Sequence, residues 1–327
     1  MNYIINRIIK TISILILVFI FIGCKQNSSK ESEILAIPLS VSIERFDKEF
    51  YLSNPEVIPK LKKNYSFLFP QKFTDSVWFN RQKDSLQLML LDTVESIFPD
   101  MTPIENDLEY LLKHLKYYFP KIKIPRVIGL INSVDYQSKA IYADSLILIS
   151  LDTYFGADHP LYNGIPNYVR QEMDIKYLSS HLTDKYVEHI LQPPRDRTLL
   201  SQMIYHGKKI YVKDLILPIK SNAIKMCYTD EQINWVKENE IYIWQYFIEN
   251  QLLYNTSPSL QQRFIEPAPF SKFYLEIDNE SPGRIGVWLG WQIIKSYISR
   301  HPKTDINEIL SLPAQTIFSK SNYKPRK

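Results

Sequence analysis

Hydrophobic side chains recur at helical spacing after Thr102 and continue to Pro120. They are Leu108, Leu111, Leu112, Leu115 and Phe119. Apolar residues with this spacing lie on one face of a helix, and proline ends such a run. The sequence Thr102-Pro103-Ile104-Glu105 also matches a capping box with proline at the first helical position. The pattern predicts a helix that packs through one face.

Other segments carry similar signals. Capping boxes occur at Ser53–Glu56 and at Thr229–Gln232, and Ser281-Pro282 is a further helix start. Long helical stretches are predicted for residues 174–192, 233–253 and 284–299. Most of the chain after residue 151 is therefore expected to be helical.

Between residues 125 and 151 the pattern changes to short β-prone runs at 127–131, 140–142 and 146–149, which turn-rich segments separate. Short connections favour antiparallel pairing, because a parallel crossover needs about a dozen residues. The predicted fold class is α+β and predominantly helical, with a small antiparallel sheet followed by a long helical half. Residues 34–318 are expected to form a single domain.

The chain begins with a pattern typical of an export signal. Arg7 and Lys10 precede an apolar run from Ile12 to Ile22, which is shorter than the roughly 18 residues that span a bilayer. Gly23-Cys24 at its end resembles a bacterial lipobox. We expect a signal peptide at 1–23, a lipidated Cys24 that attaches the chain to a membrane, and a polar tether at 24–33. The alternative is an uncleaved signal anchor with an incidental cysteine.

Composition narrows the function classes. The 327 residues are 45% hydrophobic and 23% charged, which is typical of a folded protein. Only eight residues are glycine, and neither a dinucleotide-binding nor a P-loop motif occurs. Loss of residues 1–23 lowers the formal charge from +4 to +2, and four basic residues lie in the predicted C-terminal tail, 319–327. Composition reveals no basic face, so no nucleic-acid partner is predicted.

Candidate catalytic residues are few. The six histidines include no H-E-x-x-H pair, and no serine nucleophile motif occurs. His181, Asp184 and Glu188 fall on one face of a predicted helix, and His206 follows in the next helix. They could form an irregular metal site or a polar helix surface. Cys227 could be a reactive thiol or, as we favour, a small buried apolar group.

The segment from Ser281 to Ile293 has the most distinctive composition. Gly286 and Gly290 lie four apart and form a flat strip on a helix, and Trp288 and Trp291 lie three apart. The favoured interpretation is tight helix packing in the core. The alternative is a partner-binding groove with tryptophan anchors.

At this segment the chain resembles a known family. The sequence S-P-G-R-I-G-V-W-L-G-W-Q-I-I, the preceding A-P-F-S-K-F-Y-L-E-I-D, the I-E-R-F-D-K-E-F at 43–50 and the lipobox resemble the gliding-motility lipoprotein GldB family of Bacteroidota. The resemblance runs nearly end to end. It implies a lipoprotein of the cell envelope needed for gliding, with partners in the gliding or secretion machinery. Relatives with H-E-x-x-H suggest a degenerate zincin-like scaffold that lacks this motif.

Two functions follow from these observations. The first is a lipid-anchored, non-enzymatic envelope protein that acts through protein contacts. This function requires no cofactor and no metal. The 284–291 region is one candidate contact surface. The second is a membrane-tethered hydrolase that uses His181, Glu188 and His206. Residues 25–30 contain no acidic residue, which favours a periplasm-facing protein.

Overall fold

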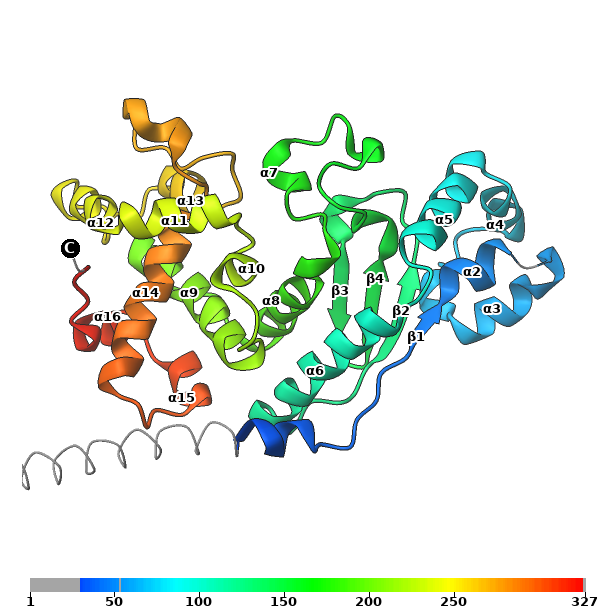
Figure 1. The fold of residues 1–327 in the computed structure, drawn as a ribbon, viewed down its shortest axis with the longest axis horizontal. Coiled ribbons are helices and arrows are strands. Elements are labelled where there is room, and N and C mark those ends of the chain that lie inside the picture. Colours follow the sequence, from blue (N-terminus) through cyan, green and yellow to red (C-terminus); the bar gives the residue numbers. More distant parts are fainter. Residues whose placement is uncertain (1–29, 53, 326–327) are drawn as a thin grey trace, which may run out of the picture.

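The protein is an elongated molecule with a sheet in one half and a bundle of helices in the other (Figure 1). The structure is a computed structural model that describes residues 30–52 and 54–325. The predicted signal peptide (1–23) and the predicted lipidation site, Cys24, lie outside the described residues. Within the described part of the chain, no helix combines the length and the apolar character that crossing a bilayer requires.

The labelled helices divide between the two halves of the molecule. Those of the sheet-bearing half are α2 (Phe46–Tyr51), α3 (Ile58–Asn64), α4 (Asp75–Gln82), α5 (Ser85–Ile97), α6 (Thr102–Tyr118), α7 (Asn167–Arg170) and α8 (Leu178–Ile190). Those of the helical half are α9 (Leu199–Ile216), α10 (Asn222–Met226), α11 (Asp230–Glu238), α12 (Glu240–Glu249), α13 (Pro258–Phe264), α14 (Ile285–Arg300), α15 (Ile306–Ser311) and α16 (Ala314–Ser321). The predicted α+β class with predominant helix is confirmed.

The sheet is mixed. Its strands are β1 (Ile43–Arg45), β2 (Arg126–Leu130), β3 (Ala140–Ala143) and β4 (Leu146–Ser150), in the order β1-β2-β4-β3. Only β3 and β4 pair antiparallel, whereas β1 with β2 and β2 with β4 are parallel. The predicted small sheet and its antiparallel pairing of β3 with β4 are confirmed, but the sheet as a whole is mixed because β2 pairs parallel on both sides. The segment from β2 to β4 is long enough for a parallel crossover, because it includes β3 at the sheet edge.

Helix α6 confirms the predicted apolar face but not the predicted cap. Its inward leucines are at most 2% exposed, and the helix ends before Pro120. No side chain caps its start. Glu105 instead accepts a hydrogen bond at 2.8 Å from the backbone N–H of Ile43. This carboxylate therefore ties α6 to the first strand of the sheet.

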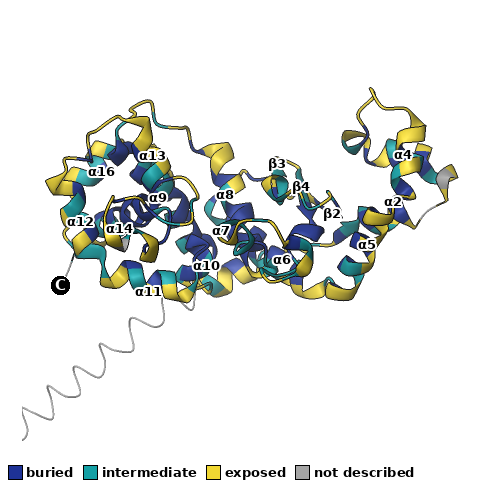
Figure 2. Ribbon diagram, turned by 90° about the horizontal axis from the view of Figure 1, so that it is seen from above, coloured by how far each residue is buried: buried dark blue, intermediate teal, exposed yellow. Residues whose placement is uncertain are grey.

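Two clusters of buried apolar side chains form the core. Figure 2 shows that buried residues occur in both halves of the molecule. One joins the sheet to helices α2 to α6 and α8, and the other lies among helices α9 to α16. Helix α9 contributes Val212 and Ile216 to the first cluster and Met203 and Ile204 to the second. Helix α9 therefore connects the two halves through buried side chains.

Glycines allow α9 and α14 to pack at very close range. A Cβ atom on Gly290 would overlap the carbonyl group of Met203, and one on Gly207 would lie 2.6 Å from the carbonyl oxygen of Gly290. Trp288 and Trp291 are 2% and 0% exposed. The packing interpretation is confirmed, and the alternative of a partner-binding surface with exposed tryptophan anchors is wrong. The 284–291 region offers no exposed residue.

Several predicted boundaries shift. Helix α14 begins at Ile285 rather than at Ser281, because Arg284 has a left-handed conformation with φ of 65°. The predicted 233–253 helix is two helices that break at Asn239. The capping box at Thr229 is confirmed. The box predicted at Ser53 involves a residue outside the described part of the chain.

Both predicted terminal segments are partly folded. Residues 30–35 are helical, although the first four of them belong to the predicted tether. Glu31 in this helix accepts a hydrogen bond from the Tyr110 hydroxyl at 3.0 Å. In the predicted basic tail, residues 319–321 belong to α16. Tyr323 is buried and donates to Glu240 at 2.8 Å. The fold therefore extends into segments that polar composition suggested were solvated.

Candidate functional site

Asp184 and Glu188, which the sequence places on one face of α8, lie along α9. Each carboxylate is paired with a lysine of α9. Asp184 accepts a hydrogen bond from the Lys213 ammonium at 2.7 Å, and Glu188 accepts one from Lys209 at 2.7 Å. Burial would raise the pKa of Asp184, but the Lys213 and Lys209 charges hold that pKa well below its usual range. Both carboxylates are thus neutralised by fixed ammonium groups.

His206 does not complete a site with these residues. Burial lowers its pKa to about 3, helped by the charges of Lys209 and Arg284, so the ring is neutral at physiological pH. Its ring contacts Tyr205. The structure thus does not bring His181, Glu188 and His206 together as the hydrolase hypothesis requires.

His181 has a different set of neighbours. Its Nδ1 atom lies 3.0 Å from the Tyr154 hydroxyl, and its Nε2 atom lies 3.4 Å from Oε2 of Glu172. The ligand atoms of His181, Glu172 and Cys227 all lie within 4.8 Å of one another. Glu172 precedes α8, and Cys227 ends α10. Three separate segments therefore converge on one buried point where the two halves of the molecule meet.

The protonation of these groups is coupled. Burial would raise the pKa of Glu172, but the His181 ring 3.4 Å away and the charges of Lys139 and Arg284 lower it to about 2. Burial also raises the pKa of the Cys227 thiol, whereas Lys213 and His181 lower it, and the net direction is downward. The pKa of His181 is raised despite its burial, because the Cys227 sulfur and the Glu172 carboxylate lie beside the ring. Each anionic form is thus favoured by a neighbouring cation.

The surroundings of this point are rich in charge. The Lys225 ammonium lies 3.0 Å from Asp214, which also accepts a hydrogen bond from the indole of Trp291 at 2.6 Å. Arg284 reaches Glu172 at 3.8 Å and donates to the Met226 carbonyl at 3.0 Å. The cluster contains five cationic side chains and four carboxylates. They are Lys139, Lys209, Lys213, Lys225, Arg284, Glu172, Asp184, Glu188 and Asp214.

Part of this cluster is predictable from the sequence. The burial of Cys227 is confirmed, since it is 4% exposed, but its neighbours are polar rather than apolar. Glu172 and Tyr154 were missed, because no spacing motif connects either of them to His181.

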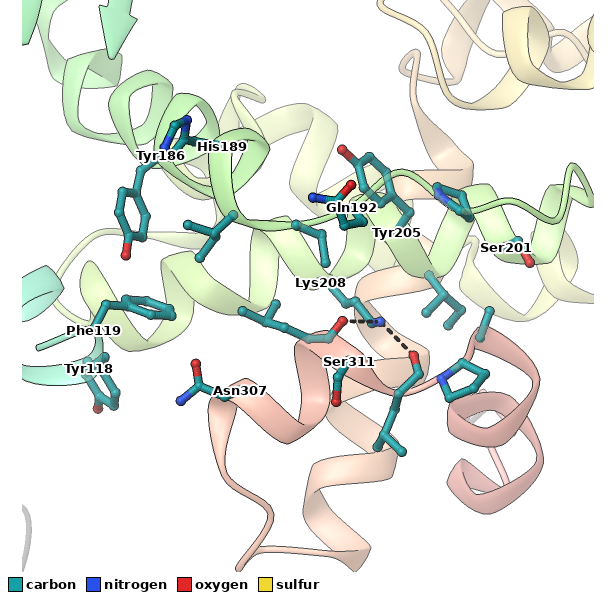
Figure 3. Close-up of a pocket in the computed structure, with 18 of the residues that line it drawn as sticks. Tyr118, Phe119, Tyr186, His189, Gln192, Ser201, Tyr205, Lys208, Asn307 and Ser311 are labelled. Carbon is teal, nitrogen blue, oxygen red and sulfur yellow. Dashed lines mark hydrogen bonds between the residues drawn. The ribbon is translucent and has the colours of Figure 1, made fainter. Parts of the chain in front are cut away.

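A groove of about 1030 Å³ is lined by residues from both halves of the molecule (Figure 3). It lies between the C-terminal end of α8, the start of α9 and the helices α15 and α16, and Phe119 lines one end. At its floor, the Lys208 ammonium donates to the carbonyls of Leu310 at 2.9 Å and Leu312 at 2.7 Å. Burial lowers the pKa of Lys208 to about 8. The lysine thereby holds the end of α15 against α9.

Comparisons with known proteins give one positive result. Searches of the curated proteins and of the solved structures found no match, so the suggested zincin-like relation has no support from them. The family described as gliding motility protein GldB matches residues 27–325. This match covers most of the chain and agrees with the resemblance seen in its sequence. The chain therefore belongs to the GldB family of gliding motility proteins.

Proposed function

We propose that this gliding motility protein is anchored in the cell envelope by lipid on Cys24 and acts through contacts with other proteins rather than by catalysis. The observation that carries the proposal is the pairing on the α8 face. Lysines bind both Asp184 and Glu188, so neither carboxylate is free to act as a general base.

The anchor would keep the folded body close to the membrane. Six residue steps separate Cys24 from Lys30, and a fully extended chain of that length spans about 20 Å. The Lys30 ammonium lies 4.7 Å from the ring of Tyr118, which also lines the groove. Lipid on Cys24 would therefore hold this end of the groove near the bilayer surface. The absence of acidic residues at 25–30 supports a periplasmic orientation.

The groove is the surface that we propose for the partner. Its lining includes apolar side chains such as Ile190 and Leu312. The charged lining residues balance to a formal charge of +1, and they are Lys121, Arg195, Lys208, Asp144 and Asp196. Asp144 pairs with Lys123, whereas Lys121 and Arg195 form no ion pair among the described residues. These two free cations fit a segment of another motility or secretion protein that carries apolar side chains flanked by carboxylates.

Complementation of a deletion strain tests both parts. Cys24→Ser should abolish spreading of the cells over a surface, and the protein should no longer fractionate with membranes. Ser311→Trp, which fills the groove, should abolish spreading while fractionation and abundance stay normal. Ser299→Trp is the matched control, because Ser299 is also an exposed serine near a helix end that bonds to a carbonyl three residues earlier.

Four results would each contradict part of the proposal. Normal spreading with Ser311→Trp removes the groove as the docking surface, and normal fractionation with Cys24→Ser removes the anchor. If Ser311→Trp alters only membrane retention, the occupant is lipid rather than protein. Digestion of the protein by protease added to intact cells would contradict the periplasmic orientation.

A further inference from the structure

We propose that Glu172, His181 and Cys227 form a binding site for a zinc-like transition metal ion, with water as the fourth ligand. The three residues offer carboxylate, imidazole and thiolate, which are the ligand types that Zn²⁺ prefers. Their ligand atoms lie within 4.8 Å of one another. In a tetrahedral zinc site such atoms are about 3.4–3.8 Å apart, as the bond lengths require. Small side-chain adjustments would close the site.

The orientation of His181 supports a ligand role. The imidazole is nine-tenths buried, and its Nδ1 atom is held by the Tyr154 hydroxyl. Its Nε2 atom is buried without a hydrogen-bond partner among the described residues and faces Glu172. Metal-bound histidines have this arrangement, with one ring nitrogen fixed by an outer hydrogen bond and the other directed at the ion. A lone pair on Nε2 that faces the Glu172 carboxylate and the Cys227 sulfur favours a cation between them, either a proton or a metal.

The backbone at Cys227 is a second, independent indication. Cys227 ends α10 in the left-handed conformation, with φ of 55° and ψ of 45°. Glycine is the usual residue at such a helix end, because a side chain on any other residue strains the backbone there. A cysteine held in this conformation directs its thiol toward His181 and Glu172. We attribute the retained strain to that placement of sulfur.

Two cations oppose the site and shape its chemistry. The Lys139 ammonium lies 3.2 Å from Oε2 of Glu172, and Arg284 lies 3.8 Å from Oε1. Both lower the affinity for a divalent ion by repulsion, and both favour an anionic fourth ligand such as hydroxide. Binding displaces the thiol proton of Cys227 to solvent, so no oxidant or reductant takes part. Glu172 is 20% exposed, which leaves the open coordination position accessible to water.

Metal analysis of the mature protein, extracted in detergent and purified without chelator, tests the proposal. We expect about one zinc ion per chain. Titration of the stripped protein with Co²⁺ should produce a thiolate-to-cobalt charge-transfer band. Cys227→Gly removes the sulfur, and this variant should fold because glycine suits the left-handed backbone. It should lack the charge-transfer band, and its zinc affinity should fall at least about tenfold. Tyr154→Phe should weaken zinc affinity about tenfold while keeping the band.

A control on the same helix distinguishes this site from adventitious binding. His189→Asn changes a histidine two turns later on α8, and it should leave zinc content and the cobalt band unchanged. The proposal is overturned if the wild type neither contains zinc nor gives the band with Co²⁺, which would mean that a proton alone fills the site. It is also overturned if Cys227→Gly retains wild-type zinc affinity, or if His189→Asn loses metal as fully as Cys227→Gly does.

Discussion

The close approach of α9 and α14 predicts that Gly290→Ala destabilises the protein although alanine is the better helix former. A Cβ atom at position 290 would fall well inside the 3.0 Å that real Cβ contacts respect, and its obstacle is the backbone carbonyl of Met203. Backbone atoms cannot swing aside as the end of a side chain can. The two helices must therefore separate.

The magnitude follows from the packing that this separation disturbs. A radial gap of about 0.5–1 Å forfeits a quarter to a half of the dispersion energy at each contact. Overpacked core substitutions typically cost about 1–3 kcal/mol, and a backbone obstacle between two buried helices belongs at the upper end. Alanine offsets about 1 kcal/mol of this through its helix propensity. We expect the free energy of unfolding to fall by about 2 kcal/mol or more.

Urea unfolding at 25 °C measures the effect, with Gly286→Ala as the matched control one turn earlier. At Gly286 the nearest atom to a new Cβ is the flexible end of Ile265, at 2.8 Å, although the Phe264 carbonyl oxygen lies at 2.9 Å. This smaller clash should largely cancel against the gain in propensity. Equal unfolding midpoints for the two variants, or a Gly290→Ala protein as stable as the wild type, would refute the reasoning.

Three further changes probe separate interactions. Lys213→Met leaves the Asp184 carboxylate without its hydrogen-bonded cation and with only the charge of Lys209 nearby, so urea unfolding should show a loss of roughly 3–5 kcal/mol, and adding Asp184→Asn should recover part of it. The pKa of Lys208 is about 8 in the folded protein and near 10.4 when unfolded, so the folded state binds fewer protons between these values. Stability relative to Lys208→Met should therefore rise as pH increases from about 8 to about 9.5, and a flat difference would contradict this. Thr229→Ala removes the capping box with Gln232 and should cost about 1 kcal/mol in the same unfolding assay, unless the cap contributes nothing.

The sequence predicted elements whose signal is local. Helix α6 was predictable because its leucines follow helical spacing and proline ends it, and the box at Thr229 was predictable because both partners lie within four residues. Glu105 shows the limit of this reasoning. Its spacing from Thr102 matches a cap, yet its carboxylate binds the backbone of β1. Propensity cannot distinguish a carboxylate that serves its own helix from one that serves a distant strand.

The candidate site depended on contacts that no local pattern contains. Glu172 and Cys227 are 55 positions apart in the sequence, and only the arrangement of α8 and α10 brings both to His181. A single cysteine in an apolar segment is usually a small buried group, so its polar contacts had no signal. The left-handed conformation that directs its sulfur is also invisible in composition, because glycine rather than cysteine marks such positions.

The ion pairs between α8 and α9, of which Lys213–Asp184 is buried, have a role that stability alone does not explain. Apolar residues of similar volume often stabilise a core as well as a buried pair does, because both charges must lose their hydration. Lys213 and Lys209 each meet one carboxylate on α8, and a shift of α8 by one turn would leave one lysine and one carboxylate without a partner. We infer that the pairs select one register of α8 on α9. Since α8 packs on the sheet and α9 packs on α14, that register fixes how the two halves of the molecule are placed.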